Sequence, residues 1–273
     1  MDRPIYDLSE GDGPLLLNVP HAGTGVPDTI RARLTAAAQR LPDTDWHIPR
    51  LYDFASGLGA TTLVARNSRY VVDLNRPPTG ESLYPGRTTT GLCPVALFSG
   101  APLYEAGGEP DEAEINDRVD AYWRPYHDEL GRQLARIKAK HGYALLFDAH
   151  SIRSRVPRLF EGRLADFNLG TAKGKSCGAA FEQAALGVLE ACQGFSWVAN
   201  GRFIGGFITR HYGAPGAGIH ALQMEQSQIT YMEEDWPFAY DAPGAATAQA
   251  VLRDLIRAVL NVDRAENHFE PAS

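Results

Sequence analysis

Two histidines each stand close behind an apolar run of the chain. His21 follows the run at 14–19, and His150 follows the run at 143–147. Short apolar runs bounded by breaker residues are typical of buried strands. In an open α/β sheet, ligands bind just beyond the carboxyl ends of such strands. The sequence therefore predicts that His21 and His150 belong to one site, although a hydrogen-bonded core histidine is the ordinary alternative for each of them.

A metal site at these histidines needs a third protein ligand, because a catalytic zinc ion commonly has three and leaves a fourth position for water. The segment 43–47, Asp-Thr-Asp-Trp-His, offers Asp43, Asp45 and His47. Asp and Thr are also common N-cap residues, so the segment could equally begin a helix without binding a metal. Asp148, two residues before the second histidine, is expected to accept the ring N–H of that histidine.

Further charged residues lie where strands are expected to end. Asp73, Asn75 and Arg76 come directly out of an apolar run, and Glu225 lies near the end of another. An arginine in such a place can hold a substrate carboxylate through two parallel hydrogen bonds. A glutamate beside a metal can take a proton from water. The structural alternative is a buried ion pair that holds loops together.

Glycine-rich and irregular stretches predict loops around this site. The segment 205–213, which contains Arg210, is expected to be a flexible loop able to close over a ligand. The stretches 77–110 and 159–175 are expected to shape or cover the site and to lie outside the core. The sequence contains no glycine-rich phosphate-binding motif, so a nucleotide cofactor is not expected.

Hydrophobic periodicity predicts the elements that position these residues. Strands are expected at 14–19, 61–65, 70–74, 143–147, 195–199 and 219–224. Helices are expected around 30–38 and at 48–58, 111–141, 176–192 and 245–260. Pro125 predicts a kink or break in the long helix, and Gly142 predicts its C-terminal cap. This alternation predicts an α/β fold with a mixed, largely parallel sheet and helices on both faces.

Composition limits the class of protein. The 273 residues contain 26 Lys and Arg against 33 Asp and Glu, a formal net charge of −7. This balance argues against nucleic acid or an anionic membrane as the main partner. No signal peptide is apparent, and no segment reaches the ~18 apolar residues that a membrane span requires. We therefore expect a single domain over residues 1–273, located in the cytoplasm, that acts on a small molecule.

Seven motifs occur in order along nearly the whole chain. They are Val-Pro-His-Ala-Gly, Asp-Thr-Asp-Trp-His, Ser-Arg-Tyr-Val-Val-Asp-Leu-Asn-Arg-Pro, Phe-Asp-Ala-His-Ser, Phe-Asn-Leu-Gly-Thr, Ile-Thr-Arg-His-Tyr-Gly and His-Ala-Leu-Gln-Met-Glu. Together they resemble the N-formylglutamate amidohydrolase family. That family is in turn similar to zinc carboxypeptidases, aspartoacylase and succinylglutamate desuccinylase, which implies a zinc-carboxypeptidase-like (phosphorylase/hydrolase-like) fold.

The resemblance implies roles for residues already singled out. His21 would be the first metal ligand and His150 the last. Asn75 and Arg76 would clamp a substrate carboxylate. Glu225 would be the general base.

In one place the chain departs from the pattern of these relatives. They carry a His-x-x-Glu pair, whereas the third residue after His21 is Thr24. The second ligand must then come from elsewhere in the chain. We expect Asp45 to supply it, with His47 as the alternative.

The activity implied by the resemblance is hydrolysis of N-formyl-L-glutamate to formate and L-glutamate, the final step of a histidine-degradation route. A divalent ion, zinc in the first place given imidazole and carboxylate ligands, would polarise the formyl carbonyl and acidify water. Because glutamate has two carboxylates, the pocket needs a second cation besides Arg76, and Arg69 or Arg210 is expected to provide it.

Other functions remain open at this point. A clamp for carboxylates does not specify the acyl group, so another N-acyl or N-formimidoyl amino acid is an alternative substrate. A non-enzymatic protein that binds an acidic amino acid is a second alternative. Serine hydrolysis through Ser151 beside His150 is disfavoured, because adjacent residues of a strand point to opposite faces of the sheet.

Overall fold

The computed structural model describes residues 4–81 and 90–262. Within these residues, one seven-stranded sheet has the order β1-β3-β2-β4-β7-β5-β6. The strands are β1 (Tyr6–Ser9), β2 (Leu15–Val19), β3 (Thr61–Ala65), β4 (Ala144–Ile152), β5 (Phe167–Gly170), β6 (Trp197–Ala199) and β7 (Ile219–Ser227). Four of the strand pairs are parallel, and the pairs β1·β3 and β5·β7 are antiparallel. The predicted mixed, largely parallel sheet is confirmed.

Helices surround this sheet. They are α1 (Asp28–Arg31), α2 (Ile48–Leu51), α3 (Glu112–Arg118), α4 (Arg124–His141), α5 (Ala179–Ala191), α6 (Phe207–Tyr212) and α7 (Ala242–Asn261). Single turns of other helix types are η1 (Ala38–Arg40), η2 (Asp53–Leu58), η4 (Pro215–Ala217) and η5 (Gln228–Thr230), and a π-helical turn, η3 (Val119–Trp123), joins α3 to α4. None of the helices in the described ranges is long and apolar enough to cross a membrane.

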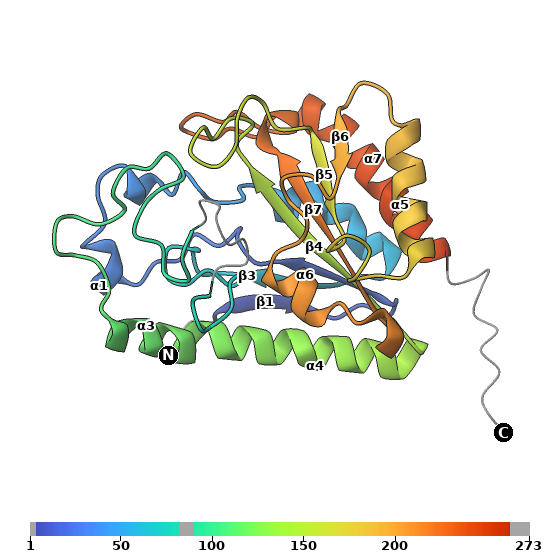
Figure 1. The fold of residues 1–273 in the computed structure, drawn as a ribbon, viewed down its shortest axis with the longest axis horizontal. Coiled ribbons are helices and arrows are strands. Elements are labelled where there is room, and N and C mark those ends of the chain that lie inside the picture. Colours follow the sequence, from blue (N-terminus) through green and yellow to red (C-terminus); the bar gives the residue numbers. More distant parts are fainter. Residues whose placement is uncertain (1–3, 82–89, 263–273) are drawn as a thin grey trace.

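The two faces of the sheet carry separate cores because successive strand residues alternate between them. Leu16 and Leu146 pack against α4 on one face, whereas Leu17 and Phe147 pack towards α5 and α7 on the other. Figure 1 shows α4 running along one side of the sheet and α5 beside α7 on the opposite side. All residues of β2 and β4 are buried, as expected for central strands covered on both faces. Helices on both faces are thus confirmed.

Five of the six predicted strands are present within a few residues of their expected positions, and two regions differ. Residues 70–74 form turns and not a strand. The polar residues that leave this run explain the difference, because the buried Asp73 side chain accepts the backbone N–H of Asn75 and so turns the chain. Conversely, the stretch 159–175, predicted to lie outside the core, contains the fully buried strand β5. Part of the other predicted loop, 82–89 within 77–110, lies outside the described residues.

The long helix predicted at 111–141 is present in three joined parts, α3, η3 and α4. The chain does not break at Pro125. Instead, the wider π turn η3 comes directly before it, and this accommodates a residue that lacks the N–H of a regular helix. Gly142 ends α4 with a left-handed backbone, φ 83°, as predicted. The helix expected around 30–38 is only the single turn α1 followed by η1.

Candidate active site

Three parallel strands bring the predicted residues to one edge of the sheet. His21 lies two residues beyond β2, His150 lies near the end of β4, and Glu225 lies opposite His150 in β7. The centroids of the two histidine rings are 4.9 Å apart. The structure therefore brings together residues about 130 positions apart, at the carboxyl ends of the strands where α/β sheets bind ligands.

The two histidines and Asp45 form a cluster with the spacing of a metal site. One potential ligand atom from each residue lies within 4.8 Å of the others, and all three residues are buried. Asp45 Oδ2 is 3.2 Å from His150 Nδ1 and 3.8 Å from His21 Nδ1. Asp45 Oδ1 is buried and has no hydrogen-bond partner among the described residues. A buried carboxylate that has one oxygen beside two imidazole nitrogens and the other oxygen unsatisfied fits a divalent cation such as zinc.

Carboxylates on the far side of each ring orient the two histidines. His21 Nε2 lies 2.8 Å from Asp73 Oδ1, and His150 Nε2 lies 3.2 Å from Asp148 Oδ2. Both rings consequently direct Nδ1 towards Asp45. Metal-binding histidines commonly have this arrangement, in which the second nitrogen is held by a carboxylate. The expected position of Asp148 agrees with the structure, whereas the contact of Asp73 with His21 was not foreseen.

The other two candidates of the segment 43–47 lie away from this cluster. His47 has a left-handed backbone, φ 62°, and its Nε2 is 2.7 Å from the Phe238 carbonyl oxygen. The Asp43 carboxylate accepts hydrogen bonds from the Tyr70 hydroxyl and the Phe98 N–H. Of the three candidates, Asp45 is therefore the one whose carboxylate faces both histidines.

Burial and neighbouring charges set the protonation of the site. Burial and the charge of Arg69 lower the pKa of His21, although Asp73 opposes them. Burial alone would raise the pKa of Asp73, but Arg69 and His21 hold it well below its ordinary value. Burial works against the charged form of His150, yet Asp148 and Asp45 hold its pKa well above the usual range. The cluster thus combines a neutral His21 with carboxylates that favour a positive charge between them.

Glu225 has the protonation behaviour of a group that exchanges protons near neutral pH. It is 8% exposed, and burial raises the pKa of its carboxyl to about 8, while the charge of His150 opposes the rise. The Gln223 amide donates to Glu225 Oε2 over 3.3 Å. Glu225 lines the same cavity as His21 and His150.

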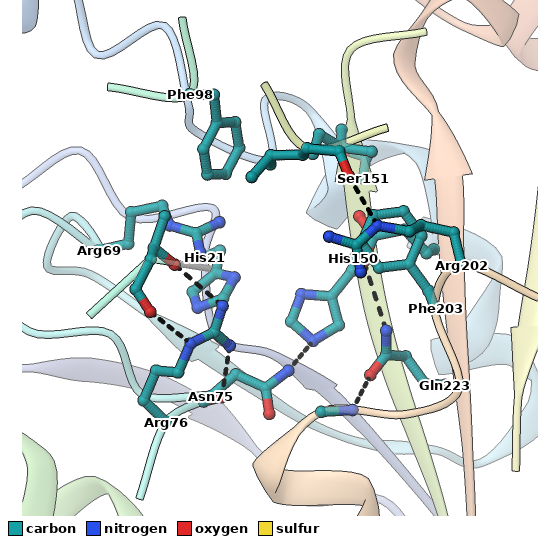
Figure 2. Close-up of a pocket in the computed structure, with 15 residues that line it drawn as sticks. His21, Arg69, Asn75, Arg76, Phe98, His150, Ser151, Arg202, Phe203 and Gln223 are labelled. Atoms are coloured by element: carbon teal, nitrogen blue, oxygen red, sulfur yellow. Dashed lines mark hydrogen bonds between the residues drawn. The ribbon is translucent and has the colours of Figure 1, made fainter. Parts of the chain in front are cut away.

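That cavity, called the central pocket below, is rich in arginine. It has a volume of about 610 Å³ including the solvent at its mouth, and its walls include the three guanidinium groups of Arg69, Arg76 and Arg202. Figure 2 shows Arg69 and Arg76 on one side of the two histidines and Arg202 on the other. Arg69 is 7% exposed, donates to Asp73 Oδ2 over 2.6 Å and stacks on the Phe98 ring. The central pocket therefore suits a small ligand with more than one negative group.

The Asn75–Arg76 pair is fixed by its surroundings. Asn75 Nδ2 lies 2.9 Å from His150 Nε2, and the Asn75 carboxamide oxygen accepts the Ile208 N–H. Arg76 donates to both oxygens of Thr90. A side chain at Gly206 would collide with the Asn75 carboxamide, because a Cβ there would lie 2.3 Å from Asn75 Nδ2. The glycine is thus required for the close approach that seats Asn75.

Of the two arginines expected to provide the second cation, Arg69 lines the central pocket and Arg210 does not. Arg210 is in helix α6, not in a flexible loop, and it lines a separate hollow with Lys173 and Lys175. Arg202 lines the central pocket, and sequence reasoning missed it. A signal was available, since Arg202 follows the predicted strand 195–199 by three residues, the same kind of position that identified the histidines.

Comparisons with known proteins identify the family of the chain. The profile of a family described as N-formylglutamate amidohydrolase matches residues 13–232. An N-formylglutamate deformylase of Pseudomonas aeruginosa is 52% identical over 256 residues, covering 94% of this chain and 96% of its own. An N-formylglutamate deformylase of Pseudomonas putida is 50% identical over 260 residues, which cover 95% of this chain and 97% of the relative. The crystal structure of an N-formylglutamate amidohydrolase from Ralstonia eutropha JMP134 superimposes with a TM-score of 0.77 at 25% identity, covering 95% and 97%.

Proposed function

Since the chain belongs to the N-formylglutamate amidohydrolase family, we propose that it hydrolyses N-formyl-L-glutamate to formate and L-glutamate. The observation that carries this proposal is the cluster of His21, Asp45 and His150 at the base of a pocket walled by arginines. A formamide with two carboxylates matches both parts, because the amide needs activation at the cluster and the carboxylates need positive partners. Following the family resemblance, we propose that the reaction is the last step of a histidine-degradation route, and the cytoplasm remains the location that we expect from the sequence.

A divalent ion, zinc in the first place, would be held by His21, Asp45 and His150. When bound there, it supplies Lewis-acid chemistry, which polarises a carbonyl and lowers the pKa of water. Asp73 and Asp148 lie beside Nε2 of the two rings, so that Nδ1 of each ring is directed towards Asp45, beside which the ion would be held.

Glu225 is proposed to move the proton. It would accept a proton from the attacking water and deliver it to the nitrogen of the departing glutamate. A general base works best when its pKa is near the working pH, and the pKa of about 8 that burial gives Glu225 is in that range.

The arginines are proposed to bind the two carboxylates of the substrate. Arg76 with Asn75 forms the clamp implied by the family resemblance, and Arg69 and Arg202 provide further positive charge in the same cavity. Hydrogen bonds to charged groups contribute about 1.5–3 kcal/mol each, so these contacts are large enough to decide which acyl amino acids bind.

The test combines elemental analysis of the purified protein with an assay of formate release from N-formyl-L-glutamate. We expect one zinc or similar ion per chain, and formate release that a chelator abolishes and added metal restores. Release of ammonia from N-formimidoyl-L-glutamate instead would identify a different substrate. A protein that binds glutamate but contains no metal and releases no formate would overturn the proposal.

A further inference from the structure

The segment that follows strand β7 contacts the loop that carries Asp45. Strand β7 carries Glu225 and ends at Ser227, and the turn η5 with Tyr231 comes directly after it. Tyr231 is 0% exposed and Gln228 is 2% exposed, so their polar groups need partners inside the protein. These partners are all close to Asp45.

The contacts lie on both sides of that ligand. Gln228 donates its amide to the carbonyl oxygen of Thr44 over 3.0 Å. The Tyr231 hydroxyl donates to the carbonyl oxygen of Trp46 over 2.9 Å. Thr44 and Trp46 are the residues immediately before and after Asp45. The backbone on each side of the carboxylate is therefore fixed by a side chain from the segment 228–231.

Strand β4 takes part in the same network. The Ser151 hydroxyl lies 2.7 Å from Tyr231 Oη and 3.4 Å from Gln228 Nε2, while its backbone N–H donates to Asp45 Oδ2 over 3.1 Å. This hydroxyl thus belongs to the same buried hydrogen-bond network as Gln228 and Tyr231. The arrangement gives Ser151 a structural partner and not a catalytic one.

We propose that Tyr231 and Gln228 are positioning residues for the metal ligand Asp45, clamping the Thr44 and Trp46 carbonyl groups so that the carboxylate faces His21 and His150. This inference rests on the proposed function. It also implies that one continuous segment, from Glu225 to Tyr231, carries the proton-transfer group and fixes the position of the loop that contains Asp45.

A need for such a clamp follows from the backbone of this loop. His47, two residues after Asp45, has φ 62°, in the left-handed region that is unfavourable for a residue with a side chain. The loop also makes a short local contact, Trp46 N–H to the Thr44 carbonyl over 2.8 Å. A conformation of this kind persists when surrounding contacts hold it, and the tyrosine and glutamine provide two of them.

The test compares Tyr231→Phe with Tyr52→Phe. Both tyrosines are almost completely buried, but the Tyr52 hydroxyl has no hydrogen-bond partner among the described residues. Tyr52→Phe is therefore a matched control for the loss of a buried hydroxyl. The zinc dissociation constant of each folded variant is measured by competition with a chromophoric chelator, and thermal unfolding of the metal-free proteins reports the fold separately.

We expect Tyr231→Phe to weaken zinc binding by about 10- to 100-fold, the usual range for residues that orient metal ligands, and Tyr52→Phe to leave it unchanged. Gln228→Met should weaken it in the same direction, and it serves if the tyrosine variant does not fold. Wild-type zinc affinity in folded Tyr231→Phe and Gln228→Met would overturn the clamp alone. Equal weakening in Tyr52→Phe would also overturn it, whereas a wild-type protein that binds no zinc would overturn the proposed function with it.

Discussion

His127 provides a pH-sensitive contact between α4 and the loop that carries Asn75 and Arg76. The ring is 5% exposed, with Nε2 2.9 Å from the carbonyl oxygen of Leu74 and Nδ1 2.9 Å from the Tyr212 hydroxyl. A neutral ring with its proton on Nε2 satisfies both contacts. Protonation of Nδ1 would put a buried charge beside the loop that carries Asn75 and Arg76.

The size of the effect follows from the pKa. Burial lowers the pKa of His127 from 6.5 to about 4, although the hydrogen bond to Leu74 opposes the change. Between these values the unfolded chain binds more protons than the native protein, so stability increases with pH. The contribution is complete above pH 6.5, is lost as pH falls through the window, and levels off below about pH 4. At about 1.4 kcal/mol per pKa unit, the total loss is about 3 kcal/mol.

Urea unfolding of the wild type and of His127→Gln, at a series of pH values, measures this directly. Glutamine can donate to Leu74 and accept from Tyr212 but does not titrate. Other ionisable groups contribute to both proteins alike, so the difference between the two free energies of unfolding isolates His127. We expect the wild type to lose about 3 kcal/mol relative to the variant on acidification from neutral pH to about pH 4. Parallel pH profiles for the two proteins would refute the reasoning.

Three further predictions concern the pocket. Arg76→Ala should raise KM strongly, since loss of a buried charged contact costs ~2–5 kcal/mol, whereas Glu225→Ala should mainly lower kcat; steady-state kinetics in which both variants changed kcat alone would contradict these roles. Arg202→Gln should raise KM for N-formyl-L-glutamate by about 10-fold or more, and Arg210→Gln, outside the pocket, should not; the reverse order would place the second carboxylate at Arg210. Gly206→Ala should lower kcat/KM by about 10- to 100-fold by displacing the carboxamide that contacts His150, and wild-type kinetics in a folded variant would count against that contact.

From the sequence, the residues at the carboxyl edge of the sheet could be predicted better than the directions of the side chains in the site. His21, His150 and Glu225 lie near the carboxyl ends of apolar strands, and short apolar runs with breakers are readily recognised. Parallel pairing then places such residues together with little further information. The same logic explains why α/β topology could be predicted, since buried strands and amphipathic helices each have a strong periodic signal.

The remaining parts of the site depend on side-chain direction, which periodicity does not contain. Asp45 and His47 are two residues apart, and the side chains of both can bind a metal. The left-handed backbone at His47, however, turns its ring towards Phe238. Asp73 was placed in a strand because its neighbours are apolar, whereas its hydrogen bonds to His21, Arg69 and a backbone N–H form a turn. In each case a tertiary contact overrides local propensity.

The local charges of the site, and not the net charge of the chain, account for an acidic protein that suits an acidic ligand. Asp45 and Asp148 are buried on opposite sides of the His150 ring, and isolated buried carboxylates are costly unless a cation compensates them. Arg76 donates to the uncharged oxygens of Thr90 and lines the central pocket. Its positive charge is therefore not paired with the Asp45 or Asp148 carboxylate. A cation is favoured between Asp45 and the two histidines, and an anion is favoured beside the arginines of the central pocket. The net charge of −7 is a sum over the whole chain, whereas the ligand is selected by the charges that line the central pocket.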